Sequence, residues 1–493
     1  MNVRNKLDET KIEKRAYING EYVWAESGEV IKKTSSIDGS DLSGIAACDE
    51  ADVNKAVAAA KKAFESGAWV NKTPEERKNV LLKLADLMEE HREELALLDT
   101  YETGRSFKNY YNDSIPKAIE CIRYFAEAID KVYDTAIPAR GSEFGVIVRK
   151  PLGVVGLITP WNDPMVVDSW KFTPALLMGN SVVIKPAEQS ALSLIYLAKL
   201  TKEAGIPDGV FNVVSGYGEK AGKALALHMD VRAISFTGSS ATGKLMLTYA
   251  GQSNMKRVYL ECGGKGPYVV TDKCNRVEEA AKVLAANMFY NEGQICSAPS
   301  RVIINRKVMD KFVECLKKES EKFVPGNPFE SENEVGCVVS KEQFDKVNSY
   351  ISWAKDNGHE VFQPANKKDN YDNACSIKPT IILNAKNDEK IAREEIFGPV
   401  VCIIPVDSTE EAIKVANDTN YGLAGALWTD DLNEAKYLAD KIEAGLVHIN
   451  SYGNDDNSAP FGGIKESGIG KDKSAFVFDE FSYQKTIWMH FGE

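Results

Sequence analysis

Three short segments of the 493-residue chain carry side chains that could perform acyl transfer: ITPWN (158–162), ECGGK (261–265) and GQICS (293–297). Asn162 supplies an amide, Glu261 a carboxylate and Cys296 a thiol, each beside residues that permit sharp turns. Together they are the parts of a site with an oxyanion donor, a general base and a nucleophile. Taken alone, Cys296 is one of nine scattered cysteines, and a cysteine is more often a small buried apolar residue.

A glycine-rich segment at 238–244 (GSSATGK) follows the apolar run AISF and nearly fits the phosphate loop of nucleoside triphosphatases. Leu245 stands where that loop needs a Ser or Thr to bind magnesium, so we expect no such activity. A second pattern, Gly216, Gly218 and Ala221 after the run FNVV, fits G-x-G-x-x-A. This pattern is a weak signal for a nucleotide and is equally typical of a tight turn before a helix.

The segment 185–188 (KPAE) ends the apolar run SVVIK and is a third candidate for binding a nucleotide. Open α/β sheets bind ligands outside the carboxyl ends of their strands, where Lys185 and Glu188 would lie. A carboxylate accepts hydrogen bonds from both hydroxyls of a ribose and repels a 2′-phosphate. Glu188 therefore favours NAD, and NADP is disfavoured.

The composition is that of a large globular protein. Hydrophobic residues make up 44% and charged residues 27%, and the net charge of −12 opposes binding to nucleic acid. The N-terminus lacks the apolar core of a signal peptide, and the most apolar stretch, 151–161, is too short to span a bilayer, so a cytoplasmic enzyme is expected. The cysteines lack C-x-x-C spacing and only five histidines are present, which opposes disulfides and a zinc site; no metal is expected.

Hydrophobic periodicity predicts the elements that must position these groups. Helical spacing covers 52–66, 73–101 and 116–133, the second with a capping box at its start. From Gly145 onward, β-branched runs (GVVGLI, SVVIK, FNVV, AISF, YVV, RVII) alternate with amphipathic helices, which predicts an α/β fold of βαβ units on a mostly parallel sheet. The stretch 136–149 predicts a two-stranded excursion. The segment YQKTIWMHF predicts an isolated strand that pairs with a neighbouring subunit.

Seven segments, in order and over nearly the whole chain, resemble the aldehyde dehydrogenase superfamily: ITPWN, FTGS, ECGGK, GQICS, EEIFGPV (394–400), NYGLAG (420–425) and PFGGIKESGIGKD (460–472). The segments EAIDKVY and QKTIW look most like the bacterial γ-glutamyl-aminobutyraldehyde and broad-range aldehyde dehydrogenase branch. The resemblance implies a Rossmann-type NAD-binding domain from 1–130 and 152–262 and an α/β catalytic domain from 263–470. It also implies a small β oligomerisation element from 131–151 and 471–493, and a homodimer or homotetramer.

The resemblance also implies a mechanism. Cys296 attacks the aldehyde to give a thiohemiacetal, whose oxyanion is held by the Asn162 amide and the Cys296 backbone N–H. Hydride leaves for the nicotinamide, and Glu261 activates the water that hydrolyses the resulting thioester. Bound nicotinamide and backbone N–H groups favour the thiolate while Glu261 opposes it, and the sequence does not decide between these effects.

The same resemblance assigns the cofactor contacts. They are Trp161, Lys185, Glu188, Gly238 and Ser239, with Glu395 on the nicotinamide ribose and Phe397 beside the ring. Within ECGGK, Cys262 replaces a usual apolar residue and is expected to be inert.

Asp163 and Asp455 depart from the family, because relatives usually place an aromatic or apolar residue at these substrate-channel positions. One interpretation is that both are solvated loop charges. The other is an acidic entrance for a small aldehyde with a cationic or polar tail, such as an ω-aminoaldehyde. Trp170, Tyr290 and Tyr452 match other channel positions and offer ring faces to a cation, and Asp113 would add to the same field.

Three alternatives stay open beside this interpretation. The chain could be a broad aliphatic aldehyde dehydrogenase, a dehydrogenase that passes the acyl group to CoA, or a catalytically silent scaffold protein. Members that use CoA tend to lack the base that Glu261 matches, so Glu261 favours hydrolysis. The joint presence of Cys296, Asn162 and Glu261 opposes a silent scaffold.

Overall fold

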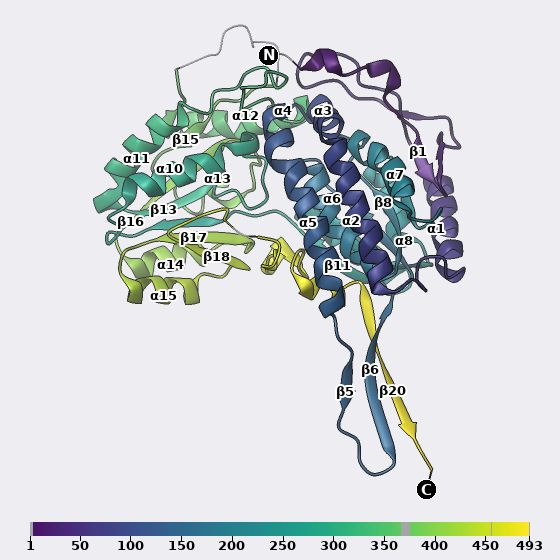
Figure 1. Cartoon of the computed structure of the whole chain (residues 1–493). Coiled ribbons are helices and arrows are strands. Elements are labelled where there is room, and N and C mark those ends of the chain that lie inside the picture. The colour runs from purple at the N-terminus through teal and green to yellow at the C-terminus, as the bar shows by residue number, and fades with distance from the viewer. Residues whose placement is uncertain (1–2, 366–374, 455, 493) are drawn as a thin grey trace.

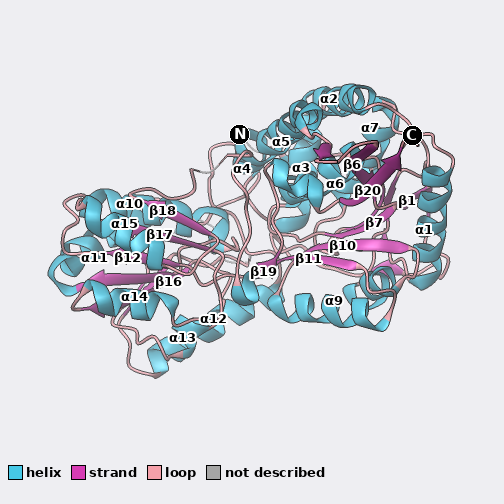
Figure 2. Ribbon diagram, turned by 90° about the horizontal axis from the view of Figure 1, so that it is seen from below, coloured by secondary structure: helices cyan, strands magenta, loops and turns pink. Residues whose placement is uncertain are grey.

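The computed structural model describes residues 3–365, 375–454 and 456–492. Two large α/β units lie side by side, each with helices on both faces of its own sheet (Figures 1 and 2). A thin three-stranded sheet extends away from them (Figure 1). The predicted α/β class is confirmed.

The sheet of the first unit has eight strands in the order β19-β11-β10-β7-β8-β9-β1-β2. The five from β11 to β9 are parallel, as the βαβ pattern predicts, and β19, β1 and β2 add antiparallel edges. The strands are β1 (Ala16–Ile18), β2 (Glu21–Val23), β7 (Val154–Ile158), β8 (Ser181–Lys185), β9 (Phe211–Val213), β10 (Val231–Thr237), β11 (Arg257–Glu261) and β19 (Gly468–Ile469). β19 therefore joins this sheet although it comes from the range expected to be catalytic.

Helices cover both faces of this sheet and bury its apolar strands in a shared core. They are α1 (Glu50–Glu65), α2 (Pro74–Glu90), α3 (Arg92–Thr103), α4 (Phe107–Asn109), α5 (Ile115–Ala128), α6 (Pro164–Leu177), α7 (Leu192–Ala204), α8 (Lys223–Leu227) and α9 (Ser240–Gln252). A short hairpin, β3 (Val30–Ile31) with β4 (Ile45–Ala46), lies outside the sheet.

The second unit is built on seven strands in the order β14-β15-β16-β13-β12-β17-β18, all parallel except β14. They are β12 (Pro267–Val270), β13 (Arg301–Asn305), β14 (Val361–Phe362), β15 (Thr380–Ile382), β16 (Val400–Val406), β17 (Ala424–Trp428) and β18 (Leu446–Ile449). The helices are α10 (Val277–Met288), α11 (Arg306–Ser320), α12 (Lys341–Asp356), α13 (Lys390–Arg393), α14 (Thr409–Asn417) and α15 (Leu432–Lys441).

The helix expected over 73–101 is two helices, because α2 ends at Glu90 and α3 begins at Arg92. His91 between them has φ −103° and ψ 22°, and its Nδ1 is hydrogen-bonded to the hydroxyl of Tyr196 on α7 at 2.9 Å. The helical pattern is thus locally periodic, but the chain breaks at His91, a residue that contacts a distant helix. The capping box at the start of α2 is confirmed: Thr73 and Glu76 each bond the other's backbone N–H.

The C-terminal strand is not isolated. β20 (Ser482–His490) pairs antiparallel with β6 (Glu143–Pro151) along its whole length, and β5 (Thr135–Ile137) completes the sheet. One edge of β20 therefore forms its backbone hydrogen bonds with β6 of the same chain, where pairing with a neighbouring subunit was expected. Large apolar side chains remain exposed on this sheet, including Phe144 at 43% and Trp488 at 52%.

Candidate active site

Residues from both units line one cavity of about 220 Å³. Among its walls are seven of the predicted residues: Trp161, Asn162, Gly238, Ser239, Cys296, Glu395 and Phe397. Its other walls are Pro160, Thr237, Cys262, Gly263, Gln343 and Lys346. Lys185, Glu188 and Glu261 are not among its walls. The structure thus brings the predicted thiol and amide together with most of the predicted cofactor contacts.

Cys296 follows a strained turn, η6 (Tyr290–Gly293). Asn291 and Glu292 both have left-handed backbone conformations, with φ of 49° and 53°, and such conformations persist only where the surroundings enforce them. Glu292 supplies part of that enforcement, because its side chain is buried and its Oε1 accepts the N–H of Gly336 at 2.6 Å. The turn therefore holds the thiol in a defined position.

Asn162 is joined to the same loop by two hydrogen bonds. Its side-chain amide donates to the carbonyl of Gln294 at 3.0 Å, and its own carbonyl accepts from the Asn291 amide at 2.7 Å. A side-chain amide has two N–H donors, and Gln294 uses one of them. Since Asn162 and Cys296 line one cavity, the second donor suits the stabilisation of an oxyanion at the carbon that the sulfur attacks.

The surroundings of Cys296 favour the protonated thiol. Burial raises its pKa most, and the nearby carboxylates of Glu261 and Glu395 raise it further. Backbone N–H groups of Ser297 and Cys296 oppose this rise only in part. The protein's own groups therefore favour the thiol over the thiolate. The effect of bound nicotinamide on this balance stays a prediction.

Glu261 ends β11 with only 6% of its surface exposed. Neither carboxylate oxygen has a hydrogen-bond partner among the residues that the structure describes. Burial raises the pKa of Glu261 well above its usual range; Asp472 adds to the rise and Lys171 opposes it. A carboxylate with a raised pKa is a stronger base and can take a proton from water. Gly462 makes room for it, because a Cβ there would lie 2.3 Å from Glu261 Oε1.

Sequence reasoning missed a buried ion pair within electrostatic reach of Glu261. Lys171 Nζ lies 2.8 Å from Asp472 Oδ2 and also donates to the Ser235 hydroxyl at 3.1 Å, and both charged side chains are almost fully buried. The signal was present in the sequence: Lys171 is the one charge in the apolar helical run SWKFTPALL. A lysine on a buried helix face needs a partner.

Lys185 and Glu188 lie at the carboxyl end of β8, where Lys185 Nζ donates to Glu188 Oε2 at 2.9 Å. The Glu188 side chain remains 29% exposed, so its carboxylate has room to accept ribose hydroxyls. Gly238 and Ser239 precede the 13-residue helix α9, whose N-terminus Ser239 caps by accepting the N–H of Thr242. A helix N-terminus attracts a pyrophosphate through its unpaired N–H groups and its dipole.

Glu395 and Phe397 enclose the cavity from the second unit. The Gly264 N–H donates to Glu395 Oε1 at 2.9 Å. The Phe397 ring meets that of Trp161 edge to face with centroids 5.3 Å apart. Gln343 on α12 donates to the Phe397 carbonyl at 2.7 Å and so fixes its left-handed backbone, a role with no sequence signal. A carboxylate and an aromatic wall beside the thiol fit a nicotinamide riboside.

Asp163 is not the uncompensated charge that an acidic entrance requires. Arg105 Nη1 lies 3.1 Å from Asp163 Oδ1, and the Arg105 guanidinium lies over the Tyr290 ring at 4.7 Å and donates to its hydroxyl. Tyr290 in turn donates to Asp113 Oδ2 at 2.5 Å, and Asp113 pairs with Lys117 at 2.9 Å. Two carboxylates are matched by two cations, so Asp163 and Asp113 belong to a charge-balanced network. The hypothesis of an acidic entrance, which also rests on Asp455, stays a prediction.

Trp170 and Tyr452, also predicted to line the substrate channel, contact other groups of the chain. Lys473 Nζ lies 5.7 Å from the centre of the Trp170 ring, so a cation of the chain itself already contacts this ring. The Tyr452 hydroxyl donates to the Ser297 carbonyl and therefore braces the residue after the nucleophile. Asp455 lies outside the described residues.

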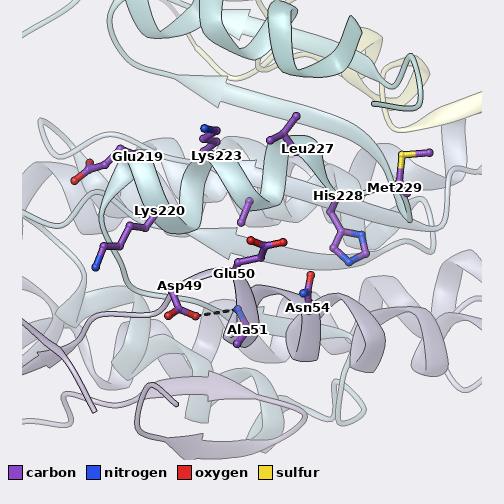
Figure 3. Close-up of a pocket in the computed structure, with 11 residues that line it drawn as sticks. Asp49, Glu50, Ala51, Asn54, Glu219, Lys220, Lys223, Leu227, His228 and Met229 are labelled. Carbon is purple, nitrogen blue, oxygen red and sulfur yellow. Dashed lines mark hydrogen bonds between the residues drawn. The ribbon is translucent and has the colours of Figure 1, made fainter. Parts of the chain in front are cut away.

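A wider surface groove of about 910 Å³ lies between the start of α1 and the segment from the turn η5 (Gly218–Gly222) to Met229 (Figure 3). None of the predicted catalytic or cofactor residues line it. The neighbouring Gly216 serves packing, because a Cβ there would lie 2.5 Å from the Cys48 carbonyl. The pattern at 216–221 therefore forms a tight turn before a helix.

All nine cysteines are free. Burial raises the pKa of Cys262 to about 12, which agrees with an inert thiol. Within the three described ranges, no group of three or more His, Cys, Asp or Glu side chains could hold a metal ion. Among the helices of the described residues, each is too short or too polar to span a lipid bilayer.

Known proteins match the chain over nearly its whole length. The profile described as "Aldehyde dehydrogenase family" matches residues 22–487. The NADP/NAD-dependent aldehyde dehydrogenase PuuC of Escherichia coli is 44% identical over 478 residues, which cover 97% of this chain and 96% of that protein. The aminoacetaldehyde dehydrogenase of Pseudomonas aeruginosa is 42% identical over 477 residues, covering 96% and 95%. The indole-3-acetaldehyde dehydrogenase AldA of P. syringae, solved with NAD+ and IAA, is 42% identical with a TM-score of 0.96, covering 99% and 98%.

Proposed function

The chain belongs to the aldehyde dehydrogenase family, and from this premise we propose that Cys296, Asn162 and Glu261 carry out the NAD-dependent oxidation of an aldehyde to a carboxylic acid. One observation carries the proposal: Cys296 and Asn162 line the same cavity as Trp161 and Glu395. A nucleophile, an oxyanion donor and the walls of a cofactor site are thereby within reach of one aldehyde carbon.

The reaction begins when the Cys296 sulfur adds to the carbonyl carbon and forms a thiohemiacetal. The Asn162 amide and the Cys296 backbone N–H stabilise the negative charge that develops on oxygen. Bound NAD supplies the hydride acceptor, and oxidation leaves the acyl group on Cys296 as a thioester. Glu261 then takes a proton from a water molecule, whose oxygen adds to the thioester carbon. The thiolate leaves, and the product is a carboxylic acid.

Glu188 supports NAD over NADP as the cofactor. Its carboxylate is partly exposed and held by Lys185 at 2.9 Å. That arrangement can accept two ribose hydroxyls, and a negative charge repels a 2′-phosphate.

Reduced-cofactor absorbance with a panel of aldehydes tests the proposal, with NAD and NADP in parallel and with or without CoA. We expect NADH to form without CoA and to vanish in Cys296→Ala. Turnover that needs CoA would instead identify an acyltransferring dehydrogenase. The absence of NADH with every aldehyde would refute catalysis.

We further propose that the physiological aldehyde carries a polar, amino-bearing tail. A relative at 42% identity is named for aminoacetaldehyde. In this chain the network of Arg105, Asp163, Tyr290 and Asp113 places polar and charged atoms beside Asn162. A polar tail can form hydrogen bonds with such a surface, which offset the cost of removing both from water. An alkyl chain would bury the same polar atoms without replacing their hydrogen bonds to water. A broad preference for aliphatic aldehydes is the competing outcome.

Assembly into a homodimer or homotetramer through the protruding sheet is part of the proposal. The sheet β5-β6-β20 stands away from both units (Figure 1), and Trp488 and Phe491 on or just after β20 are 52% and 57% exposed. Exposed aromatic side chains on a sheet of this kind are typical of an interface. Light scattering measures the mass, and Trp488→Asp is expected to shift it toward the monomer.

A further inference from the structure

Lys33 reaches from the N-terminal hairpin into the first α/β unit. Its backbone is fixed next to β3, because its N–H donates to the Ser43 hydroxyl at 3.2 Å and its carbonyl accepts the N–H of Leu42 at 3.0 Å. The side chain is 15% exposed and ends beside Glu102 of α3, whose side chain is fully buried. A long flexible lysine is thus anchored at its base and its tip.

Three oxygen atoms surround the Lys33 ammonium. One belongs to the Glu102 carboxylate, and the others are the carbonyls of Glu188 at 3.1 Å and Gln189 at 3.2 Å. An ammonium group has three N–H donors, so donors and acceptors match in number. The second oxygen of Glu102 accepts the N–H of Leu192, at the start of α7, at 2.6 Å.

These contacts converge on the connection between β8 and α7. The connection is held at Glu188 and Gln189 by Lys33, and at Leu192 by Glu102. It is also the segment that carries the Glu188 side chain, whose carboxylate is the proposed partner of the cofactor ribose. The backbone carbonyl of Glu188 faces Lys33 while its carboxylate meets Lys185. One residue is therefore fixed from both ends.

We infer that Lys33 is a positioning residue for the cofactor: its ammonium, paired with Glu102, fixes the turn that presents the Glu188 carboxylate to the adenosine ribose. The inference rests on the proposed NAD-binding role of Glu188. None of the residues that Lys33 contacts lines the Cys296 cavity. A substitution of Lys33 should therefore affect the binding of the cofactor and leave the chemistry at the aldehyde unchanged. The lysine and the glutamate are 69 positions apart in the chain.

The physical reason lies in burial. Hydrogen bonds between a charged donor and buried oxygens are stronger than those between neutral groups, and water competes with them poorly. Removal of the ammonium would leave the buried Glu102 carboxylate without its cation and two carbonyls without this donor. The turn would then sample positions in which Glu188 no longer meets both ribose hydroxyls.

Lys33→Met tests this, with Lys32→Met as the matched control. Lys32 is the exposed neighbour, so its substitution removes the same charge one residue away. Calorimetric titration of the purified variants with NAD measures binding without turnover. We expect Kd for NAD, and Ki for AMP, to rise about tenfold in Lys33→Met, as for the loss of one charged hydrogen bond. KM for the aldehyde and all constants of Lys32→Met should stay unchanged.

Ammonium ion provides a second readout that a merely structural role would not move. Ammonium chloride should restore NAD affinity to Lys33→Met, because a free ammonium fits among the three oxygens, whereas tetramethylammonium chloride, which lacks N–H donors, should not. An unchanged Kd for NAD in folded Lys33→Met would overturn the inference. So would an equal loss in NAD and aldehyde affinity that ammonium does not reverse. Wild-type protein that binds no NAD would instead refute the proposed function.

Discussion

Arg105 Nη1 lies 3.1 Å from Asp163 Oδ1, with the arginine side chain 1% exposed and the aspartate side chain 24% exposed. Asp163 directly follows Asn162, so this pair sets the charge beside the proposed oxyanion donor. Arg105 also connects Asp163 to Tyr290, and Tyr290 connects to Asp113. A substitution of Asp163 therefore changes the electrostatics of the whole network.

Asp163→Phe should lower kcat/KM for 4-aminobutanal relative to hexanal, because it replaces a charged side chain of the proposed substrate channel with an apolar one. It should also lower the free energy of unfolding by about 3 kcal/mol, since it strands a buried guanidinium. Asp163→Phe combined with Arg105→Met separates the two effects: stability should recover while the preference for hexanal remains. A wild-type preference for hexanal that Asp163→Phe leaves unchanged would count against the polar-tail proposal.

Glu261→Gln should separate acylation from hydrolysis. Without a base the thioester is hydrolysed only by water that no side chain activates, so kcat should fall by about 10² to 10⁴. The first turnover should still release close to one NADH per Cys296, visible as a burst in stopped-flow absorbance. Cys296→Ala is the control that must show no burst. A Glu261→Gln variant that turns over at the wild-type rate would assign the base to another residue.

Lys171→Met should move the pH profile of thioester hydrolysis. Lys171 opposes the rise in the Glu261 pKa, which burial and Asp472 cause. With the cation gone, the pKa of Glu261 rises further, and a general base is active only above its pKa. The acidic limb of kcat should therefore shift toward alkaline pH. Lys171→Arg should retain the wild-type limb, and equal profiles in all three proteins would show that Glu261 does not sense Lys171.

The sequence predicted the parts of the site that short motifs encode. Cys296, Asn162 and the cofactor contacts lie in contiguous segments with turn-forming neighbours, so their types and spacing indicate chemistry directly. Arg105 and Lys33 could not be found in this way, because each is a single charge whose partners lie far along the chain. Asp163 shows the consequence: its type predicted a negative entrance, and only the buried arginine beside it reveals the balance of charge.

The fold shows the same division between local and distant causes. The β-branched runs and the capping box of α2 are local patterns and were predicted. His91, where the helical pattern is interrupted, contacts Tyr196 of a distant helix. The pairing of β20 with β6 likewise joins segments that lie far apart in the chain. Long-range pairing of this kind leaves no trace in a local window.

Asp168 should make the protein less stable as the pH rises. Burial raises its pKa to about 7, against the opposing effects of Thr159 and Lys171, and only 1% of the residue is exposed. The folded protein therefore binds a proton that the unfolded chain has lost. The resulting stabilisation is complete below the unfolded pKa of 3.8 and is lost as the pH rises through about 7.

Asp168→Asn keeps the shape of the side chain but cannot ionise. It should raise the free energy of unfolding, relative to wild type, by more at pH of about 8 than at about 5, with a ceiling of about 4 kcal/mol for the full difference between the two pKa values. Denaturant unfolding at several pH values measures this. Asp440→Asn, at a side chain 75% exposed, is the control and should show no such trend. A parallel pH dependence of wild type and Asp168→Asn would mean that Asp168 is already ionised in the folded protein, and that Lys171 and Thr159 outweigh its burial.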